Sequence, residues 1–166
     1  IPALSAVPAF RERIRRGAAF VGRMLADEGV IYGVTTGYGE SVGVAVPREL
    51  VHELPERLST YHGVGLGPPF GAEETRAILA ARLQSLVQGF SGVSEGLLEA
   101  LTRLLIDDVL PVIPQEGSVG ASGDLTPLSY VAAVLRGERE VMLDGVIVST
   151  RSAFEARGLS ALQLAP

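Results

Sequence analysis

The chain is 166 residues long, 47% of them hydrophobic, and carries a formal net charge of −5. This length supports one packed core and is too short for two large ones, and the scattered arginines of an acidic chain exclude the basic face of a nucleic-acid-binding protein. No apolar run reaches the roughly 20 residues that span a bilayer, so we expect a soluble, cytoplasmic protein.

The first predicted element is a long amphipathic helix. Between Val7 and Asp27 apolar residues recur at helical spacing with arginine and glutamate between them, and Gly29 follows as a terminator. The next stretch, residues 30–43, reads VIYGVTTGYGESVG and contains too many glycines for a stable helix. We predict a short extended piece there that runs into a loop.

A second helix is predicted from Pro47 to Leu58, because proline is well placed in the first turn of a helix. Within this helix, Pro55 is expected to produce a kink. Residues 61–71 follow with the sequence YHGVGLGPPFG, in which glycine and proline are so dense that only a loop is expected. His62 stands at the mouth of that loop.

The middle of the chain predicts a helical hairpin. Residues 73–87 and 93–110 both show helical periodicity, and the sequence SGVS between them supplies a break and a helix N-cap. A glycine-rich segment then precedes a helix predicted over residues 125–136. Thr126 is the expected N-cap of this helix and Pro127 lies in its first turn.

The last predicted elements are a β-hairpin and a short helix. The sequence EVMLDGVIV, residues 140–148, has the pattern of two short strands, and Asp144-Gly145 suits the tight turn between them. With small β elements expected here and near residues 30–40, the predicted fold class is mainly α, in one domain over residues 1–166.

The segment GSVGASGD, residues 117–124, holds the residues best suited to covalent chemistry. Glycines around Ala121-Ser122-Gly123 let the backbone fold sharply enough for the amide nitrogen of Gly123 to approach the carbonyl carbon of Ala121. Ring closure with loss of two waters, one of them from the Ser122 side chain, gives a conjugated ring with an exposed, electrophilic methylidene carbon. Taken alone, however, such a segment is more typical of a solvated turn before a helix.

The wider run GSVGASGDLTPLS, residues 117–129, resembles position by position the signature of the histidine and phenylalanine ammonia-lyase family. The prosthetic group of that family, 4-methylideneimidazole-5-one (MIO), forms from Ala-Ser-Gly. Two further segments are similar to the family: IYGVTTGYG, residues 31–39, resembles its tyrosine loop, and YHGVGLGPP, residues 61–69, resembles its histidine-containing turn. Together they extend the resemblance over essentially the whole chain.

The resemblance implies a role for each candidate catalytic residue. Ala121, Ser122 and Gly123 would form MIO without a metal or a nucleotide, and Asp124 would assist its formation. Tyr32 would transfer a proton at or near the β-carbon of the substrate. Without the resemblance, a half-buried phenol hydrogen-bonded to the backbone would be the simpler interpretation of this tyrosine.

Tyr61 and His62 would contact the substrate. His62 lies in the matching glycine-rich segment and would orient a substrate ring, whereas His52 lies among charged helical residues and is expected on the surface. Tyr38 stands where the family usually has phenylalanine and is expected to pack. In the family, Ser-His at this pair of positions resembles histidine enzymes, His-Leu tyrosine enzymes and Phe-Leu phenylalanine enzymes, so Tyr61-His62 favours histidine, with tyrosine close behind.

The implied reaction is the non-oxidative elimination of ammonia from an L-amino acid, with L-histidine giving trans-urocanate. Tyrosine or phenylalanine ammonia-lyase and a 2,3-aminomutase stay open as alternatives. The resemblance further implies an N-terminal MIO-bearing domain of the ammonia-lyase (aspartase/fumarase-like) fold, truncated before a central helical bundle, and a homotetramer whose sites combine several subunits. An inactive fragment or scaffold that needs a second polypeptide is the alternative from another class.

Other chemistries fit the sequence less well. Cysteine and lysine are absent, which excludes disulfides, thiolate nucleophiles, zinc–thiolate sites and a Schiff-base lysine within this stretch. GYGESVG lacks the Gly-Lys-Ser/Thr ending of a phosphate-binding loop. A Ser-His-Asp triad of Ser122, His62 and Asp124 has no G-x-S-x-G elbow, and Asp124 is too close to Ser122 in sequence to orient a distant histidine easily.

Overall fold

Helices dominate the fold, as the sequence predicts. The computed structural model describes residues 4–27, 29–119 and 125–163. The α-helices, in chain order, are α1 (Pro8–Ala26), α2 (Leu54–His62), α3 (Ala72–Leu86), α4 (Glu95–Ile106), α5 (Leu125–Leu135) and α6 (Thr150–Arg157). The short 3-10 helices η1 (Gly39–Gly43) and η2 (Arg48–Leu50) lie between α1 and α2.

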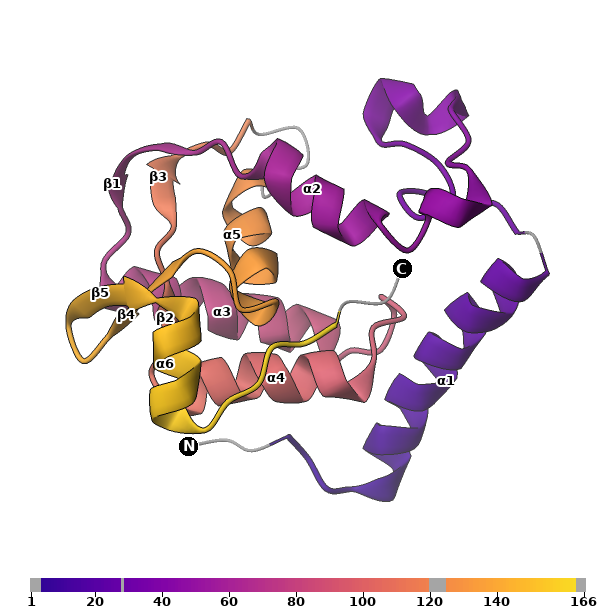
Figure 1. The fold of residues 1–166 in the computed structure, drawn as a ribbon. Coiled ribbons are helices and arrows are strands. Elements are labelled where there is room, and N and C mark those ends of the chain that lie inside the picture. Colours follow the sequence, from indigo (N-terminus) through magenta and orange to yellow (C-terminus); the bar gives the residue numbers. More distant parts are fainter. Residues whose placement is uncertain (1–3, 28, 120–124, 164–166) are drawn as a thin grey trace.

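Short strands form small antiparallel sheets at the edge of the helices (Figure 1). The strands are β1 (Leu66–Pro69), β2 (Leu110–Pro111), β3 (Pro114–Glu116), β4 (Glu140–Leu143) and β5 (Val146–Ser149). β1 pairs with β3, and a second sheet has the order β2-β4-β5. The β4–β5 hairpin turns at Asp144 and Gly145, which both have positive φ, so the predicted hairpin is confirmed.

The core lies where α3, α4 and α5 meet the sheet that contains β2 and β4. Its fully buried side chains include Leu79, Leu98, Leu104, Val134 and Val141. Each such side chain stabilises the fold by about 1.5–3 kcal/mol relative to an exposed position. In Figure 1, α3 and α4 lie side by side below α5, and α6 stands at the end of this body beside the β4–β5 hairpin.

The long helix α1 stands apart from this body in Figure 1 and contacts it through apolar side chains and a set of ion pairs. Ile14 is buried in the core cluster. Arg11 bonds Glu95 at 3.1 Å and Glu99 at 2.6 Å, and Arg15 bonds Glu95 at 2.8 Å, so α1 is tied to the first two turns of α4. None of the described helices, α1 included, is long and apolar enough to cross a membrane.

The predicted helical hairpin is confirmed by α3 and α4, and the predicted cap is present. Ser94, the last residue of SGVS, accepts a hydrogen bond from the amide of Leu97 at 3.2 Å. The cap predicted for the next helix is wrong, because Thr126 lies inside the first turn of α5. The small β element expected near residues 30–40 is present as an isolated antiparallel bridge between Thr36 and Ala45.

Proline explains the remaining differences from the predicted elements. A helix does not run from Pro47 to Leu58; instead Pro55 lies in the first turn of α2, where its missing N–H costs nothing. The segment predicted as a loop over residues 61–71 begins with the end of α2 and continues as β1. Among the described strands, Leu66–Pro69 pairs with β3 alone, and proline is tolerated in such an edge strand.

Candidate active site

The segment from residue 29 to residue 46 folds into a tight loop that presents Tyr32. Inside the loop, Oγ1 of Thr36 accepts a hydrogen bond from the amide of Gly33 at 3.2 Å, a local bond that suits threonine in a turn. Tyr32 remains 60% exposed. Its Oη accepts a hydrogen bond from the amide of Gly39 at 2.9 Å, so the phenol oxygen is held by the start of η1 while its ring stays accessible.

Tyr38 joins Tyr32 to His62 through two edge-to-face ring contacts. Its ring centroid lies 5.8 Å from that of Tyr32, with the rings at 89°, and 6.2 Å from that of His62, with the rings at 85°. Aromatic rings favour this geometry. Burial and, to a smaller extent, the neighbouring Tyr32 raise the pKa of Tyr38, so its phenol stays neutral and its ring packs between the two candidate residues.

His62 is the last residue of α2, and the turn that follows it is attached to both neighbours of the segment 118–124. On one side, the amide of Gly65 donates a hydrogen bond to Oη of Tyr130, in α5, at 3.1 Å. On the other side, Gly65 lies so close to β3 that an added Cβ would be 3.0 Å from Cβ of Pro114. The turn after His62 is therefore wedged between β3 and α5.

Gly117 brings together the two ends of the segment that carries Ala-Ser-Gly. A Cβ at Gly117 would lie 2.6 Å from Cγ2 of Thr126 and 3.3 Å from Cα of Gly65. The end of β3, the first turn of α5 and the turn after His62 thus meet at one point. The predicted MIO-forming residues and their neighbour lie outside the described residues: Ala121, Ser122, Gly123 and Asp124.

Tyr61 faces a different side of α2 from His62, since consecutive residues of a helix point about 100° apart. Tyr61 is 68% exposed and borders, with Glu56 and Arg57 among others, a hollow of about 380 Å³. The structure therefore brings Tyr32 and His62 together around Tyr38 but leaves Tyr61 outside this group.

Sequence reasoning missed a role for Tyr130 and for Arg139. Tyr130 directly follows the matching run at residues 117–129, and its phenol is only 7% exposed. The guanidinium of Arg139 lies over its ring, 4.1 Å from the centroid. The position of Tyr130 next to the matching run could have indicated a role for this residue. No sequence pattern indicates a role for Arg139, because its contacts come from distant segments.

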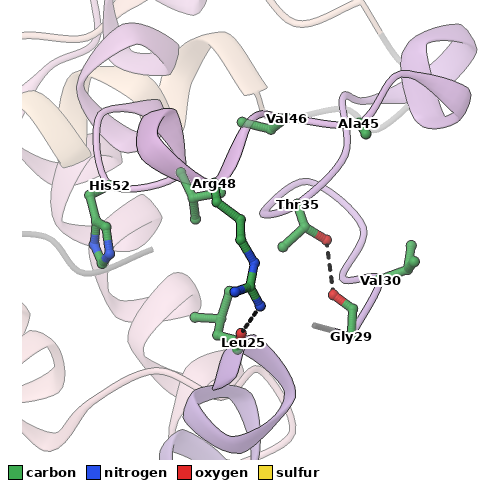
Figure 2. A pocket seen from close by; sticks show the side chains of 9 residues that line it. Leu25, Gly29, Val30, Thr35, Ala45, Val46, Arg48 and His52 are labelled. Atoms are coloured by element: carbon green, nitrogen blue, oxygen red, sulfur yellow. Dashed lines mark hydrogen bonds between the residues drawn. The ribbon is translucent and has the colours of Figure 1, made fainter. Parts of the chain in front are cut away.

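A larger hollow, of about 480 Å³, lies away from these residues, between the end of α1 and the tyrosine loop (Figure 2). Its wall is mostly apolar, with Leu25 and Val46, and Nη2 of Arg48 donates to the carbonyl of Leu25 at 3.3 Å. His52, expected on the surface, is exposed at this hollow. Of the predicted site residues that the structure describes, none lines this hollow. Within the described part of the chain, no three acidic or histidine side chains gather to hold a metal ion.

The fold of this chain is shared with solved enzyme structures. Among solved structures, the ergothioneine-degrading enzyme ergothionase from Treponema denticola is similar with a TM-score of 0.90 and 29% identity. That similarity covers 96% of this chain and 32% of the other. The model of the aromatic amino acid lyase family matches residues 2–166. The chain belongs to the aromatic amino acid lyase family.

The curated relatives include histidine ammonia-lyases and tyrosine 2,3-aminomutases. A histidine ammonia-lyase from Gloeobacter violaceus is 42% identical over 157 residues, which is 95% of this chain and 30% of that protein. An MIO-dependent tyrosine 2,3-aminomutase from Streptomyces globisporus is 47% identical over 134 residues, which is 81% of this chain and 25% of that protein. The chain thus spans 25–30% of the length of these relatives.

Proposed function

We propose that this chain carries the prosthetic-group segment of an enzyme that eliminates ammonia from an L-amino acid, with L-histidine giving trans-urocanate. The observation that carries the proposal is the convergence of the three segments that resemble the family. The turn after His62 touches both ends of the segment 118–124 at Gly65 and Gly117, and Tyr38 joins His62 to Tyr32.

The residues present fit the MIO group. Its atoms have sources in the carbonyl of Ala121, the side chain of Ser122 and the amide of Gly123. The close approach of Gly117 to Thr126 holds the flanks of this segment together, as a backbone that must turn back on itself requires. When formed, the group supplies an electrophilic methylidene carbon that makes the β-proton of the substrate removable.

The residues of this chain then have separate tasks. Elimination breaks the Cβ–H and Cα–N bonds and forms a Cα–Cβ double bond, so one side chain must take the β-proton as ammonia leaves. We assign this proton to Oη of Tyr32, which the Gly39 amide holds in place while the ring stays exposed. His62 is assigned to orient the substrate ring by hydrogen bonding, and Asp124 to assist ring formation.

A complete substrate site needs more surface than this chain offers. Pockets for small molecules bury most of the ligand, whereas Tyr32 and Tyr61 are 60% and 68% exposed. We propose that residues from outside this chain, within the tetramer that the family forms, cover the substrate and complete the site. The chain itself would be the MIO-bearing domain that precedes a central helical bundle.

Tyrosine is the second candidate substrate, in an ammonia-lyase or a 2,3-aminomutase. Tyr61 stands beside His62 where the histidine enzymes have serine, and a relative at 47% identity is named a tyrosine 2,3-aminomutase. Turnover of L-histidine, L-tyrosine and L-phenylalanine, followed by ultraviolet absorbance of the unsaturated product and by chromatography of β-amino acids, distinguishes these activities. We expect L-histidine to be turned over fastest, and Tyr61→Ser to increase that preference.

The first test is the intact mass of the protein beside that of its Ser122→Ala variant. We expect the parent alone to lack about 36 Da, the mass of two waters lost on ring closure. A parent of full mass would contradict the proposed chemistry and favour a scaffold that needs a second polypeptide. A mass deficit without turnover of any of the three amino acids would refute the substrate assignment and leave the prosthetic group in place.

A further inference from the structure

Arg139 has an unusual backbone conformation at a position where the chain is tightly held. It follows the end of α5 and has φ of +63°, in the left-handed region that long side chains rarely adopt. Thr150, which is fully buried, donates from its amide to the carbonyl of Arg139 at 3.0 Å and from Oγ1 to the carbonyl of Glu138 at 2.7 Å. A strained conformation persists only where neighbours determine it in this way.

The side chain of Arg139 reaches the turn that follows His62. Its guanidinium lies over the ring of Tyr130, and its Nη2 donates a hydrogen bond to the carbonyl of Gly63 at 3.0 Å. Oη of the same Tyr130 accepts the hydrogen bond from the amide of Gly65. The carbonyl of Gly63 and the amide of Gly65 are thus each hydrogen-bonded to one member of the stacked pair of Arg139 and Tyr130.

The fit between Arg139 and the turn is close. A Cβ at Gly63 would collide with the guanidinium of Arg139 and would lie 2.6 Å from the carbonyl oxygen of Ser59. Because both the carbonyl and the Cα of Gly63 contact the same guanidinium, the turn has little room to rotate. Since His62 is bonded directly to Gly63, fixing this turn also fixes the end of α2 that carries the imidazole.

We propose that Arg139, stacked on Tyr130, is a positioning residue that fixes the direction in which His62 faces the substrate. The proposal rests on the proposed function of His62 as a substrate contact. Arg139 itself is assigned no contact with the substrate and acts only through Gly63 and Tyr130. A planar, always charged guanidinium suits this task, because it can stack on the ring and donate in its own plane at the same time.

The direct test measures hydrogen exchange at the amide of Gly65. Arg139→Gln keeps an unbranched polar side chain and the cost of the backbone conformation but removes the cation over Tyr130, and we expect the Gly65 amide to exchange about tenfold faster. Arg151→Gln, at an exposed position on α6, makes the same chemical change and should leave Gly65 unaffected. Unchanged exchange at Gly65 in Arg139→Gln would refute the proposal.

Two further variants separate the contacts. Tyr130→Phe keeps the ring beneath Arg139 and removes only the acceptor, so Gly65 should again exchange about tenfold faster in a protein that stays folded. Arg139→Lys retains the charge and a donor for Gly63 but loses the planar stack, and should restore part of the protection. If Arg139→Lys protects the Gly65 amide as fully as the parent does, the stacked geometry has no role and the proposal is wrong.

Steady-state kinetics of the complete enzyme test whether the turn after His62 affects substrate binding. For Arg139→Gln we expect KM for the amino acid to rise about tenfold while kcat changes by less than about twofold, because ground-state orientation is lost. Lower activity at constant KM would indicate a merely structural role and overturn the proposal. If the parent turns over none of the amino acids, the proposed function fails, and exchange at Gly65 still decides whether Arg139 holds the turn.

Discussion

Replacing Gly33 by alanine tests how backbone conformation and ring packing combine in the tyrosine loop. Gly33 has φ of +72°, and a left-handed conformation costs an L-amino acid about 1–2 kcal/mol. In addition, the new Cβ would lie 2.5 Å from Cε1 of Tyr38. That is about 1 Å inside the ordinary contact distance of roughly 3.5 Å, so the Tyr38 ring must retreat.

The backbone conformation and the ring contact together determine how far Gly33→Ala lowers the free energy of unfolding. Overpacking of this kind costs about 1–3 kcal/mol, and a retreating ring also weakens the edge contacts with Tyr32 and His62. Alanine restricts the unfolded chain, which offsets roughly 0.4–1 kcal/mol. We therefore expect Gly33→Ala to lower the free energy of unfolding by about 3 kcal/mol, or Tm by about 6–12 °C for a chain of this length.

Two glycines of the same loop serve as matched controls. Gly39 has φ of +54° but no atom within 4 Å of an added Cβ, so Gly39→Ala should carry only the conformational cost, about 1 kcal/mol. Gly43 has neither a positive φ nor a close neighbour, and Gly43→Ala should leave Tm unchanged or slightly raised. Thermal unfolding followed by circular dichroism measures the series. Equal losses for Gly33→Ala and Gly39→Ala would refute the packing part of this reasoning.

Three other substitutions test the attachment of α1 and the core. Hydrogen bonds from Arg15 and then Arg11 hold the pKa of Glu95 below its ordinary value of 4.5, so this carboxylate stabilises the docked helix above that pH and the contribution is lost as the pH falls below it. The protection of α1 amides, measured as exchange relative to the intrinsic rate at each pH, should fall at acid pH in the parent and already at neutral pH in Glu95→Gln. Equal protection in both proteins at neutral pH would show that the ion pairs do not hold α1. Thr75 is fully buried, and its Oγ1 has no hydrogen-bond partner among the described residues. Thr75→Val should therefore increase the free energy of unfolding by up to about 1 kcal/mol, measured by denaturant unfolding. A clear loss of stability would show that the hydroxyl has a partner. Gly22 lies within α1, and a Cβ added there would meet no atom within 4 Å. Gly22→Ala should therefore raise Tm, because alanine favours a helix over glycine by about 0.5–1 kcal/mol. A lower Tm would indicate a contact at this position.

Periodicity predicted the elements that bury an apolar face. The helices α1, α3 and α4 and the β4–β5 hairpin follow patterns of apolar residues, and such patterns depend on local sequence alone. Where glycine and proline dominate, as between Pro47 and Pro69, the prediction was wrong about α2 and β1. The conformation there depends on partners such as β3, which lie far away in the sequence.

For the candidate site, the sequence identified the segments but not how they meet. Tyr32 and His62 were identified by resemblance, yet the ring of Tyr38 that joins them could not be placed, because a contact between two loops follows from the fold of both. The same holds for Arg139, whose role depends on the close approach of Gly63 to the end of α5. Contacts between irregular segments that are far apart in the sequence produce no local periodic pattern, so they cannot be predicted from such a pattern.

The glycines of this site mark tight packing, although a glycine-rich composition suggests flexibility. A run rich in glycine usually indicates a flexible loop. At Gly63, Gly65 and Gly117, however, an added Cβ would meet the guanidinium of Arg139, the ring of Pro114 or the side chain of Thr126 within about 3 Å. At these glycines a neighbouring side chain packs directly against the backbone, so the absence of a Cβ makes the arrangement tight. The turn after His62 and the flanks of the Ala-Ser-Gly segment can therefore hold a fixed relation, which a proton transfer between placed groups requires.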